Sequence, residues 1–317
     1  MFSLLFPGQG SQRPGMGRSW ESNPSWAVVE ELSQALGRNL ARLLLDAEED
    51  ELRETRNAQL AAYTLSLVVL DGMHRGPLNP SATAVPVAVA GHSLGEYTAL
   101  VAAGALDAAG GARLVQARAE AMHAASEANP GTMAAVLGLD MATVANLCEQ
   151  FEGIWVANDN APGQVVIAGT LGAVERTATA VLDRGAKRVI SLRVGGAFHT
   201  PLMHPAQAQL DAALQEAAFS SPRCPVVSNV DAQPHLGSFG PLLSAQLCSQ
   251  VRWRESLLSL ERAGARLFVE LGPGTELSGM ARRTVPGAAR ISVATPEGVE
   301  ALGEALRASA RAIYDPQ

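Results

Sequence analysis

Short apolar runs alternate with longer amphipathic segments along the first part of the chain. Residues 2–6 and 85–90 are almost wholly apolar, which is typical of strands buried on both faces of a sheet. Helical apolar spacing marks segments 27–46, 58–74 and 108–125, and small residues follow the second run as far as about residue 103. Strands and helices that alternate in this way predict a mostly parallel sheet in an α/β domain.

A different order of elements begins near residue 130. The pattern predicts, in sequence, a strand at 133–137, a helix at 141–151, strands at 154–157 and 164–168, a helix at 171–184 and a strand at 188–194. This βαββαβ order is the ferredoxin-like arrangement. We therefore expect residues 130–195 to form a small inserted subdomain. The larger α/β domain would comprise 1–129 and 196–317, with further strands at 226–229 and 267–271.

Composition and charge narrow the class of protein. The 317 residues leave room for two domains, or for one domain with an insertion. Apolar types make up 47% and charged types 17%, which excludes a disordered chain or a coiled coil. The net charge is −7, and Lys187 is the only lysine, so a broad basic surface for nucleic acid is not expected. Every other basic residue besides the histidines is an arginine, a side chain suited to bidentate contact with carboxylate or phosphate.

The cysteines and the apolar runs bear on compartment and cofactors. Cys148, Cys224 and Cys248 are widely spaced and form no C-x-x-C pair, which favours free thiols in a reducing compartment and no zinc or redox dithiol. The run 2–6 lacks a basic flank and ends at a Pro-Gly pair, so it is too short for a signal or a membrane span. We expect a cytoplasmic protein that does not enter the membrane.

The segment Gly91-His92-Ser93-Leu94-Gly95 matches the G-x-S-x-G nucleophile elbow. It lies between a predicted strand and a predicted helix, where the elbow needs to be. Its glycines permit a sharp turn that exposes Ser93, and the amide of Leu94 at the helix N-terminus would face an oxyanion. The alternative is a chance match in a chain with many glycines.

A nucleophilic serine needs a base, and position separates the candidate histidines. His92 lies on the elbow itself and is expected to point away from Ser93, in a structural role. His199 follows the predicted insertion, where the chain returns to the larger domain and could face Ser93 across a cleft. His204 is the second candidate, and a core or surface histidine is the alternative for both.

Arg118 lies on an apolar helical stripe with Leu114, Val115 and Met122. An arginine at such a position needs an anionic partner, because an unpaired buried charge is unfavourable. Either it binds a substrate carboxylate, with Met122 lining the same pocket, or it snorkels to solvent or forms an internal salt bridge to Glu120 or Glu96.

Several longer motifs resemble the malonyl-CoA:acyl carrier protein transacylases and the related acyltransferases of polyketide synthesis and malonate decarboxylase. The similarity covers nearly the whole chain. It is carried by Phe6-Pro7-Gly8-Gln9-Gly10-Ser11-Gln12, Gly91 to Tyr97, Asn160 to Gly169, Ala197-Phe198-His199 and Asn229-Val230-Asp231. The resemblance implies a hydrolase-like α/β domain with a ferredoxin-like insert, and it leaves the pathway open among the three branches.

The resemblance also implies roles for individual residues. Ser93 would accept the acyl group, and His199 would be its general base. The backbone amides of Gln9 and Leu94 would form the oxyanion hole. The backbone carbonyl of Gln246, in place of an acidic residue, would orient the histidine.

Further residues are assigned to substrate binding on the same grounds. Arg118 would bind the malonyl carboxylate, and Asn158 and Asn160 would line the thioester side of the cleft. Phe198 before the histidine favours malonyl over methylmalonyl. The implied substrates are malonyl-CoA and an acyl carrier protein, with no metal or other cofactor, and the family suggests a monomer.

Two other function classes compete with this interpretation. A serine esterase or thioesterase would use the same elbow, with an acidic residue between Ser93 and His199 as the third catalytic group. The acidic candidates, Asp140, Asp159 and Asp183, fall in or beside the predicted insertion, which disfavours a hydrolase. A non-catalytic scaffold that retains the fold is the other alternative.

An acidic carrier protein would be repelled by a chain of net charge −7 unless arginines gather near the cleft. The sequence therefore predicts a local basic surface, for which Arg252, Arg282 and Arg283 are candidates.

Overall fold

The computed structural model describes residues 1–76 and 85–304. Its centre is a six-stranded sheet, parallel except for one antiparallel edge pair, β7 with β8. The strand order is β10-β9-β1-β2-β7-β8. The strands are β1 (Phe2–Phe6), β2 (Val89–Gly91), β7 (Val226–Val227), β8 (Pro234–His235), β9 (Leu267–Leu271) and β10 (Ala289–Val293).

Helices cover both faces of this sheet. Around it lie α1 (Ala27–Leu36), α2 (Leu40–Leu45), α3 (Glu49–Arg53), α4 (Thr55–Arg75), α5 (Gly95–Ala103), α6 (Ala108–Ala128), α9 (His204–Glu216), α10 (Phe239–Gln246), α11 (Trp253–Arg262) and α12 (Glu276–Thr284). Three short 3-10 helices are η1 (Arg18–Trp20), η2 (Pro24–Trp26) and η3 (Pro201–Met203). No helix in residues 1–76 or 85–304 is long and apolar enough to cross a membrane.

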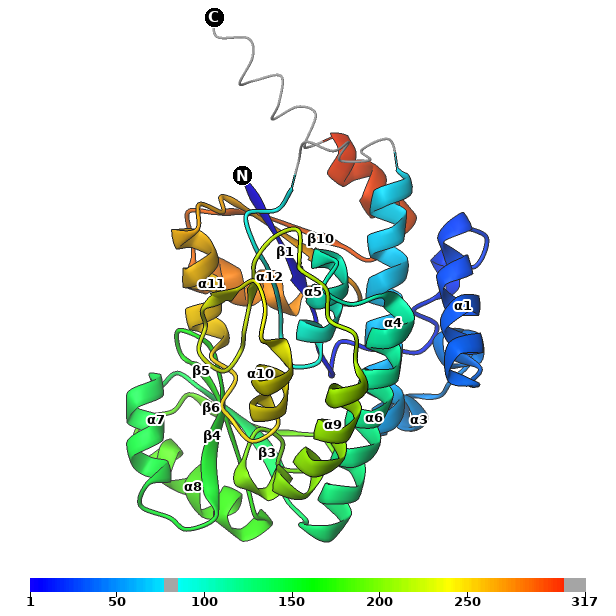
Figure 1. Ribbon diagram of the computed structural model, residues 1–317. Coiled ribbons are helices and arrows are strands. Elements are labelled where there is room, and N and C mark those ends of the chain that lie inside the picture. Colours follow the sequence, from blue (N-terminus) through cyan, green and yellow to red (C-terminus); the bar gives the residue numbers. More distant parts are fainter. Residues whose placement is uncertain (77–84, 305–317) are drawn as a thin grey trace, which may run out of the picture.

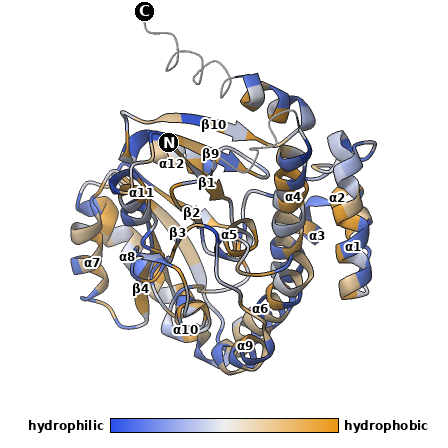
Figure 2. Cartoon of the chain, turned by 45° about the horizontal axis from the view of Figure 1, so that its top comes forward, coloured by the Kyte–Doolittle hydropathy of each residue, from blue (hydrophilic) through white to orange (hydrophobic). Residues whose placement is uncertain are grey.

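The strand β1 is apolar except for Ser3 because both of its faces are buried. Leu4 and Phe6 pack into the cluster beneath α4 and α5, whereas Leu5 points to the opposite cluster beneath α11 and α12. In Figure 2 hydrophobic residues gather on the strands of the large sheet and on α4, and hydrophilic residues lie along the outer side of α1. The sequence pattern of a doubly covered parallel strand is therefore confirmed.

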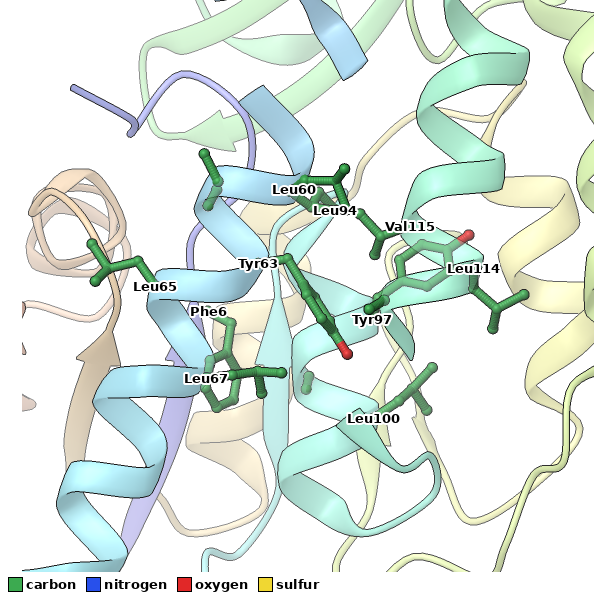
Figure 3. Packing of buried hydrophobic residues seen from close by; sticks show 14 of the residues in the cluster. Phe6, Leu60, Tyr63, Leu65, Leu67, Leu94, Tyr97, Leu100, Leu114 and Val115 are labelled. Atoms are coloured by element: carbon green, nitrogen blue, oxygen red, sulfur yellow. The ribbon is translucent and has the colours of Figure 1, made fainter. Parts of the chain in front are cut away.

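Apolar side chains lock α4, α5 and α6 together. Tyr63 on α4, Tyr97 on α5 and Leu114 on α6 belong to one buried cluster, and Figure 3 shows them with Leu60, Leu94, Leu100 and Val115. The Tyr63 hydroxyl also donates to the Ala108 carbonyl at 2.8 Å. This packing fixes the relative positions of three helices that each carry a polar residue of the site described below.

A second, antiparallel sheet of four strands lies beside the large one (Figure 1). Its order is β4-β5-β3-β6, and its elements are β3 (Thr132–Leu137), α7 (Met141–Cys148), β4 (Ile154–Ala161), β5 (Gln164–Gly169), α8 (Leu171–Asp183) and β6 (Arg188–Leu192). Ala134 and Val136 face α7 and α8, whereas Met133 and Ala135 join the large hydrophobic cluster. The predicted ferredoxin-like arrangement is confirmed. We propose the predicted division, 130–195 within 1–129 and 196–317, because β3 to β6 fall inside those limits.

Backbone hydrogen bonds join this small sheet to the larger part of the chain. The Val251 amide donates to the Ala157 carbonyl at 2.8 Å, and the Asp159 amide donates to the Val251 carbonyl at 3.0 Å. Asp159 also accepts from Arg254 Nε at 2.8 Å. The strand β4 is therefore connected directly to the segment that leads into α11.

Several predicted boundaries differ from the structure. The segment 27–46 is two helices, α1 and α2, because the chain turns at Gly37 with a φ of 62°. The strand expected at 85–90 is the shorter β2, and β4 runs on to Ala161 instead of ending at 157. The helix expected at 141–151 ends at Cys148, and the strands expected at 188–194 and 226–229 end at Leu192 and Val227. Apolar runs mark buried chain without marking where backbone pairing stops.

Candidate active site

The strand β2 ends in a sharp turn that presents Ser93 at the start of α5. Ser93 has a φ of 53°, a left-handed conformation that is unfavourable for a residue with a side chain. The turn needs both of its glycines. A Cβ on Gly91 would lie 1.8 Å from the Gly95 carbonyl carbon, and a Cβ on Gly95 would lie 2.1 Å from the Phe6 carbonyl oxygen. The G-x-S-x-G pattern thus has the strand–turn–helix geometry of a nucleophile elbow.

His199 faces Ser93 as predicted from its place in the sequence. Its Nε2 lies 2.7 Å from Ser93 Oγ, and its Nδ1 lies 2.8 Å from the Gln246 backbone carbonyl oxygen. Because a carbonyl can only accept, Nδ1 carries the proton, and Nε2 is free to accept from the serine. Burial, with the charge of Arg118 as the second cause, lowers the pKa of His199 to about 3. The imidazole is therefore held in its neutral, basic form.

None of the acidic residues considered for a hydrolase triad contacts His199 in the described chain. Asp140 caps α7 by accepting from the Thr143 amide at 2.9 Å. Asp159 pairs with Arg254. Asp183 ends α8 on the surface. The group that orients the histidine is instead the backbone carbonyl of Gln246.

Arg118 is buried beside the serine, with 1% of its surface exposed. Its Nη2 lies 3.0 Å from Ser93 Oγ and 3.0 Å from Gln246 Oε1, and its Nη1 lies 2.7 Å from Gln59 Oε1. The guanidinium carbon lies 5.6 Å from the centre of the Tyr97 ring. All of its hydrogen-bond partners are neutral, so a buried cation stands next to the nucleophile.

Neither acidic residue suggested as a salt-bridge partner for Arg118 forms an ion pair with it in the chain as described. Glu120 is exposed and accepts instead from Gln116 at 3.1 Å. Glu96 is linked to Arg118 only through Gln246, which donates to Glu96 Oε2 at 2.7 Å. The interpretation of Arg118 as half of an internal salt bridge is therefore wrong.

Neither Met122 nor Arg118 is among the residues that line the cleft over Ser93, and both contact the side-chain amide of Gln59. The Met122 sulfur accepts from Gln59 Nε2 at 3.4 Å, whereas Gln59 Oε1 accepts from Arg118. The helix α6 does place Met122 on the same buried stripe as Arg118. Helical periodicity located this stripe but could not show that a residue from α4 is inserted beside it.

A cleft above Ser93 runs between the two sheets. Gln9, Phe198 and the paired amides Asn158 and Asn160 line it, together with His92. The Asn160 Oδ1 lies 2.8 Å from His92 Nε2, and Asn158 Nδ2 lies 3.4 Å from the same nitrogen. His92 therefore lies in the cleft wall, directed at the two asparagines, while His199 is the histidine that reaches the serine.

Apolar side chains complete the walls of the cleft. They come from β3, β5, the end of β6 and α12, and they are Met133, Val166, Leu192, Val194, Leu277 and Met280. The backbone amides of Gln9 and Leu94 donate no hydrogen bond to any group within the described residues, which leaves both available as hydrogen-bond donors. Leu94 precedes the first turn of α5, where unpaired amides attract negative charge.

The remaining candidates lie away from Ser93 or are already paired. His204 is exposed at the first residue of α9. Arg252, one candidate for the local basic surface, is paired with Glu255 at 2.5 Å, so its charge is balanced. Arg282 and Arg283 are exposed on α12, and Arg283 donates to Gln164.

Three polar residues of the site were not predicted as site residues. Gln59 holds Arg118 from α4, Asn229 accepts from the Ser93 amide at 2.6 Å, and Glu96 accepts from the Asn229 amide at 3.0 Å. The sequence carried a signal for two of them, because Glu96 lies in the motif Gly91 to Tyr97 and Asn229 begins the motif Asn229-Val230-Asp231, whereas Gln59 lies in no such motif. No group of three or more His, Cys, Asp or Glu side chains in the described ranges could hold a metal ion.

A strained serine at an elbow of a parallel sheet, hydrogen-bonded to a neutral histidine, defines an enzyme that forms a covalent ester on serine. The model of the acyl transferase domain family matches residues 3–299. The chain belongs to this family and is an acyltransferase. The resemblance found in its motifs is thereby confirmed.

Relatives and solved structures agree with this membership. A malonyl CoA-acyl carrier protein transacylase of Bacillus subtilis is 38% identical over 96% of this chain and 97% of its own. The crystal structure of an acyl-carrier-protein S-malonyltransferase from Bartonella henselae has a TM-score of 0.91 and 37% identity, covering 96% of this chain and 99% of its own. A malonyl transacylase structure in complex with its type II polyketide synthase acyl carrier protein has a TM-score of 0.88 and 34% identity, covering 94% and 97%.

Proposed function

We propose that this acyltransferase moves a malonyl group from coenzyme A to the phosphopantetheine thiol of an acyl carrier protein through a malonyl-serine ester. The observation that carries the proposal is the buried guanidinium of Arg118, 3.0 Å from Ser93 Oγ and paired with no carboxylate in the described chain. The carboxylate of a malonyl group, two bonds from the reacting carbonyl carbon, would neutralise this charge. The names of the relatives and of the solved structures support the same substrates.

In the first step Ser93 Oγ attacks the thioester carbonyl carbon while its proton passes to His199 Nε2. The Gln246 carbonyl holds the imidazole in the required tautomer. We assign the developing oxyanion to the amides of Gln9 and Leu94, each such donor being worth about 3 kcal/mol. The protonated His199 then gives its proton to the departing coenzyme A thiolate, and the acyl ester remains on the serine.

In the second step the same groups act on the carrier. His199 accepts the proton of the phosphopantetheine thiol, the thiolate attacks the ester, and the imidazolium returns the proton to Ser93 Oγ. Arg118 holds the acyl carboxylate during both steps, and Phe198, Asn158 and Asn160 form the walls along which the thioester arm lies. The chemistry uses side chains and backbone groups of this chain alone.

A labelling experiment distinguishes this function from its rivals. The protein is incubated with malonyl-labelled malonyl-CoA, with and without a phosphopantetheinylated carrier, and the label is followed on protein, on carrier and as free malonate. We expect label on Ser93 that passes to the carrier. Prompt release of free malonate would establish a thioesterase instead, and no label above that of a Ser93→Ala variant would establish a scaffold.

We propose that the carrier docks beside α12, because this helix lines the cleft with Leu277 and Met280 and also exposes Arg282 and Arg283. Reversing these two charges should raise the KM for carrier and flatten its salt dependence, while Arg113→Glu on the exposed side of α6 should not. Equal effects of both substitutions would refute this site. We retain a cytoplasmic protein as part of the proposal, supported by its three free cysteines, and a monomer, as the motif resemblance implied.

A further inference from the structure

Glu96 holds a buried carboxylate in the first turn of α5, three residues beyond Ser93. Its exposed fraction is 2%, and no cation pairs with it directly in the part of the chain that the structure describes. Its Oε2 accepts from Gln246 Nε2 at 2.7 Å and from the Asn229 amide at 3.0 Å. Burial raises the pKa of Glu96 to about 7. Burying an unpaired carboxylic acid is unfavourable, so we expect Glu96 to have a specific role in the site.

The Gln246 side chain connects this carboxylate to the anion receptor. Its Nε2 donates to Glu96 Oε2 and to the Ser93 carbonyl oxygen, at 2.7 and 3.1 Å. Its Oε1 accepts from Arg118 Nη2 at 3.0 Å. An ionised carboxylate can only accept and a guanidinium can only donate, so only one of the two orientations of the amide satisfies both neighbours. Glu96 and Arg118 therefore set the direction of Gln246 from opposite ends.

Inserting an amide between Glu96 and Arg118 has a different result from a direct salt bridge. A carboxylate in contact with the guanidinium would occupy its paired N–H groups and satisfy its charge. Through Gln246 the charge of Glu96 is held one residue away, and Arg118 Nη2 remains directed at Ser93 Oγ. The guanidinium is held in place without being neutralised by a carboxylate of the described chain.

We propose that Glu96 is a positioning residue for acyl transfer, which acts through the Gln246 amide to aim the Arg118 guanidinium at the acyl group on Ser93. This inference rests on the proposed function, because it takes Arg118 as the receptor of the acyl carboxylate. Glu96 also acts on the elbow by a second route. It fixes Asn229, whose side chain accepts from the Ser93 amide at 2.6 Å and donates to the Gly91 carbonyl at 2.8 Å.

The two routes have different kinetic consequences. Loosening the elbow through Asn229 slows acylation by any thioester, whereas misdirecting Arg118 affects only a substrate that carries a carboxylate. The ratio of kcat/KM for malonyl-CoA to kcat/KM for acetyl-CoA therefore isolates the route through Gln246. A general loss of folding does not change this ratio.

The experiment measures this ratio in Glu96→Met, Gln246→Met and Glu96→Gln, each in the wild-type and in the Arg118→Ala background. Methionine fills a similar volume and offers no strong acceptor, and Gln246→Met retains the backbone carbonyl that orients His199. Glutamine at position 96 can still accept from both partners of Oε2. Glu120→Met is the matched control, because Glu120 is exposed on the helix that carries Arg118.

We expect Glu96→Met and Gln246→Met each to lower the ratio about tenfold, the effect of one charge-assisted hydrogen bond, and the double variant to lower it no further. Glu96→Gln should restore most of the ratio, and in the Arg118→Ala background none of the substitutions should change it. If Glu96→Met fails to fold, Gln246→Met carries the same test.

Other results overturn the inference. A ratio unchanged by Gln246→Met would show that the amide does not aim the guanidinium. A ratio as low in Glu96→Gln as in Glu96→Met would show that charge, not hydrogen bonding, is what matters. If the wild-type protein shows no preference for malonyl-CoA, the proposed function itself fails. A preference that depends on Arg118 but not on Glu96 or Gln246 refutes the inference alone.

Discussion

Replacing Arg118 with alanine is the most direct test of how the site selects its substrate. The side chain is 1% exposed, and its Nη2 lies 3.0 Å from Ser93 Oγ, so any acyl group on the serine lies within its reach. Alanine removes the charge and leaves Gln59 and Gln246 without their shared donor. Acylation by malonyl-CoA should therefore fall, while acylation by acetyl-CoA should be unchanged or rise.

The size of the effect follows from the contacts that a carboxylate would make. A bidentate ion pair consists of two charge-assisted hydrogen bonds, each worth about 1.5–3 kcal/mol. Losing the pair therefore costs roughly 3–6 kcal/mol in total. At about 1.4 kcal/mol per tenfold change, the ratio of the two kcat/KM values should fall by about 10²–10⁴. Acetyl-CoA makes no such pair, and the buried guanidinium disfavours it in the wild-type protein.

The assay is rapid-quench labelling of Ser93 with each thioester, which measures acylation separately from transfer to the carrier. Arg113→Ala is the matched control, since Arg113 lies one and a half turns earlier on α6 and is exposed. Arg118→Lys retains a positive charge without the fork and should recover only part of the ratio. A malonyl preference that survives Arg118→Ala would refute the assignment of this residue as the carboxylate receptor.

Three further predictions concern stability. Burial raises the pKa of Glu96 from 4.5 to about 7, although its hydrogen bonds and the charge of Arg118 lower it. The contribution of Glu96 to the unfolding free energy is therefore fully present below pH 4.5 and is lost as the pH rises to 7. The loss amounts to roughly 3 kcal/mol and should vanish in Glu96→Gln. Urea titrations between pH 4 and 8 measure it, and an identical pH slope in both proteins would contradict the burial argument. Gly95→Ala would bring a Cβ to 2.1 Å from a carbonyl oxygen of β1 and should cost about 3 kcal/mol or more, while Gly240→Ala, which meets nothing within 4 Å, should be nearly neutral in the same assay. Asp159→Asn should cost about 2 kcal/mol, and a double-mutant cycle with Arg254→Met should return most of that as coupling, so additive effects would exclude a stabilising pair.

The parts of the fold that the sequence predicted are those governed by local pattern. The apolar run at 2–6, the glycines of the elbow and the βαββαβ order each depend on residues close together in the chain, and all three are confirmed. Element ends were less predictable. The strand β4 continues to Ala161 because β5 and the Val251 segment offer it partners, and an apolar pattern does not record those partners.

The catalytic pair was predictable from the sequence, whereas two residues that support the site were not. Ser93 and His199 could be chosen because a motif and a position in the domain order pointed to them. Gln59 and Glu96 reach the site from two different helices, and only the packing of α4, α5 and α6 brings them together. The helical stripe around Arg118 predicted its burial but left its partner open between a substrate carboxylate, solvent and an acidic residue of the chain. Within the described chain the fold supplies neutral amides.

The connection between β4 and the segment before α11 has a mechanical consequence. The strand β4, which lines one wall of the cleft, is joined to the larger part of the chain by two backbone hydrogen bonds at Val251 and by the pair between Asp159 and Arg254. Opening the cleft along this side requires breaking these bonds together. Asn158, between the two bonded residues, is therefore held in place, and this wall of the cleft stays where the larger part of the chain puts it.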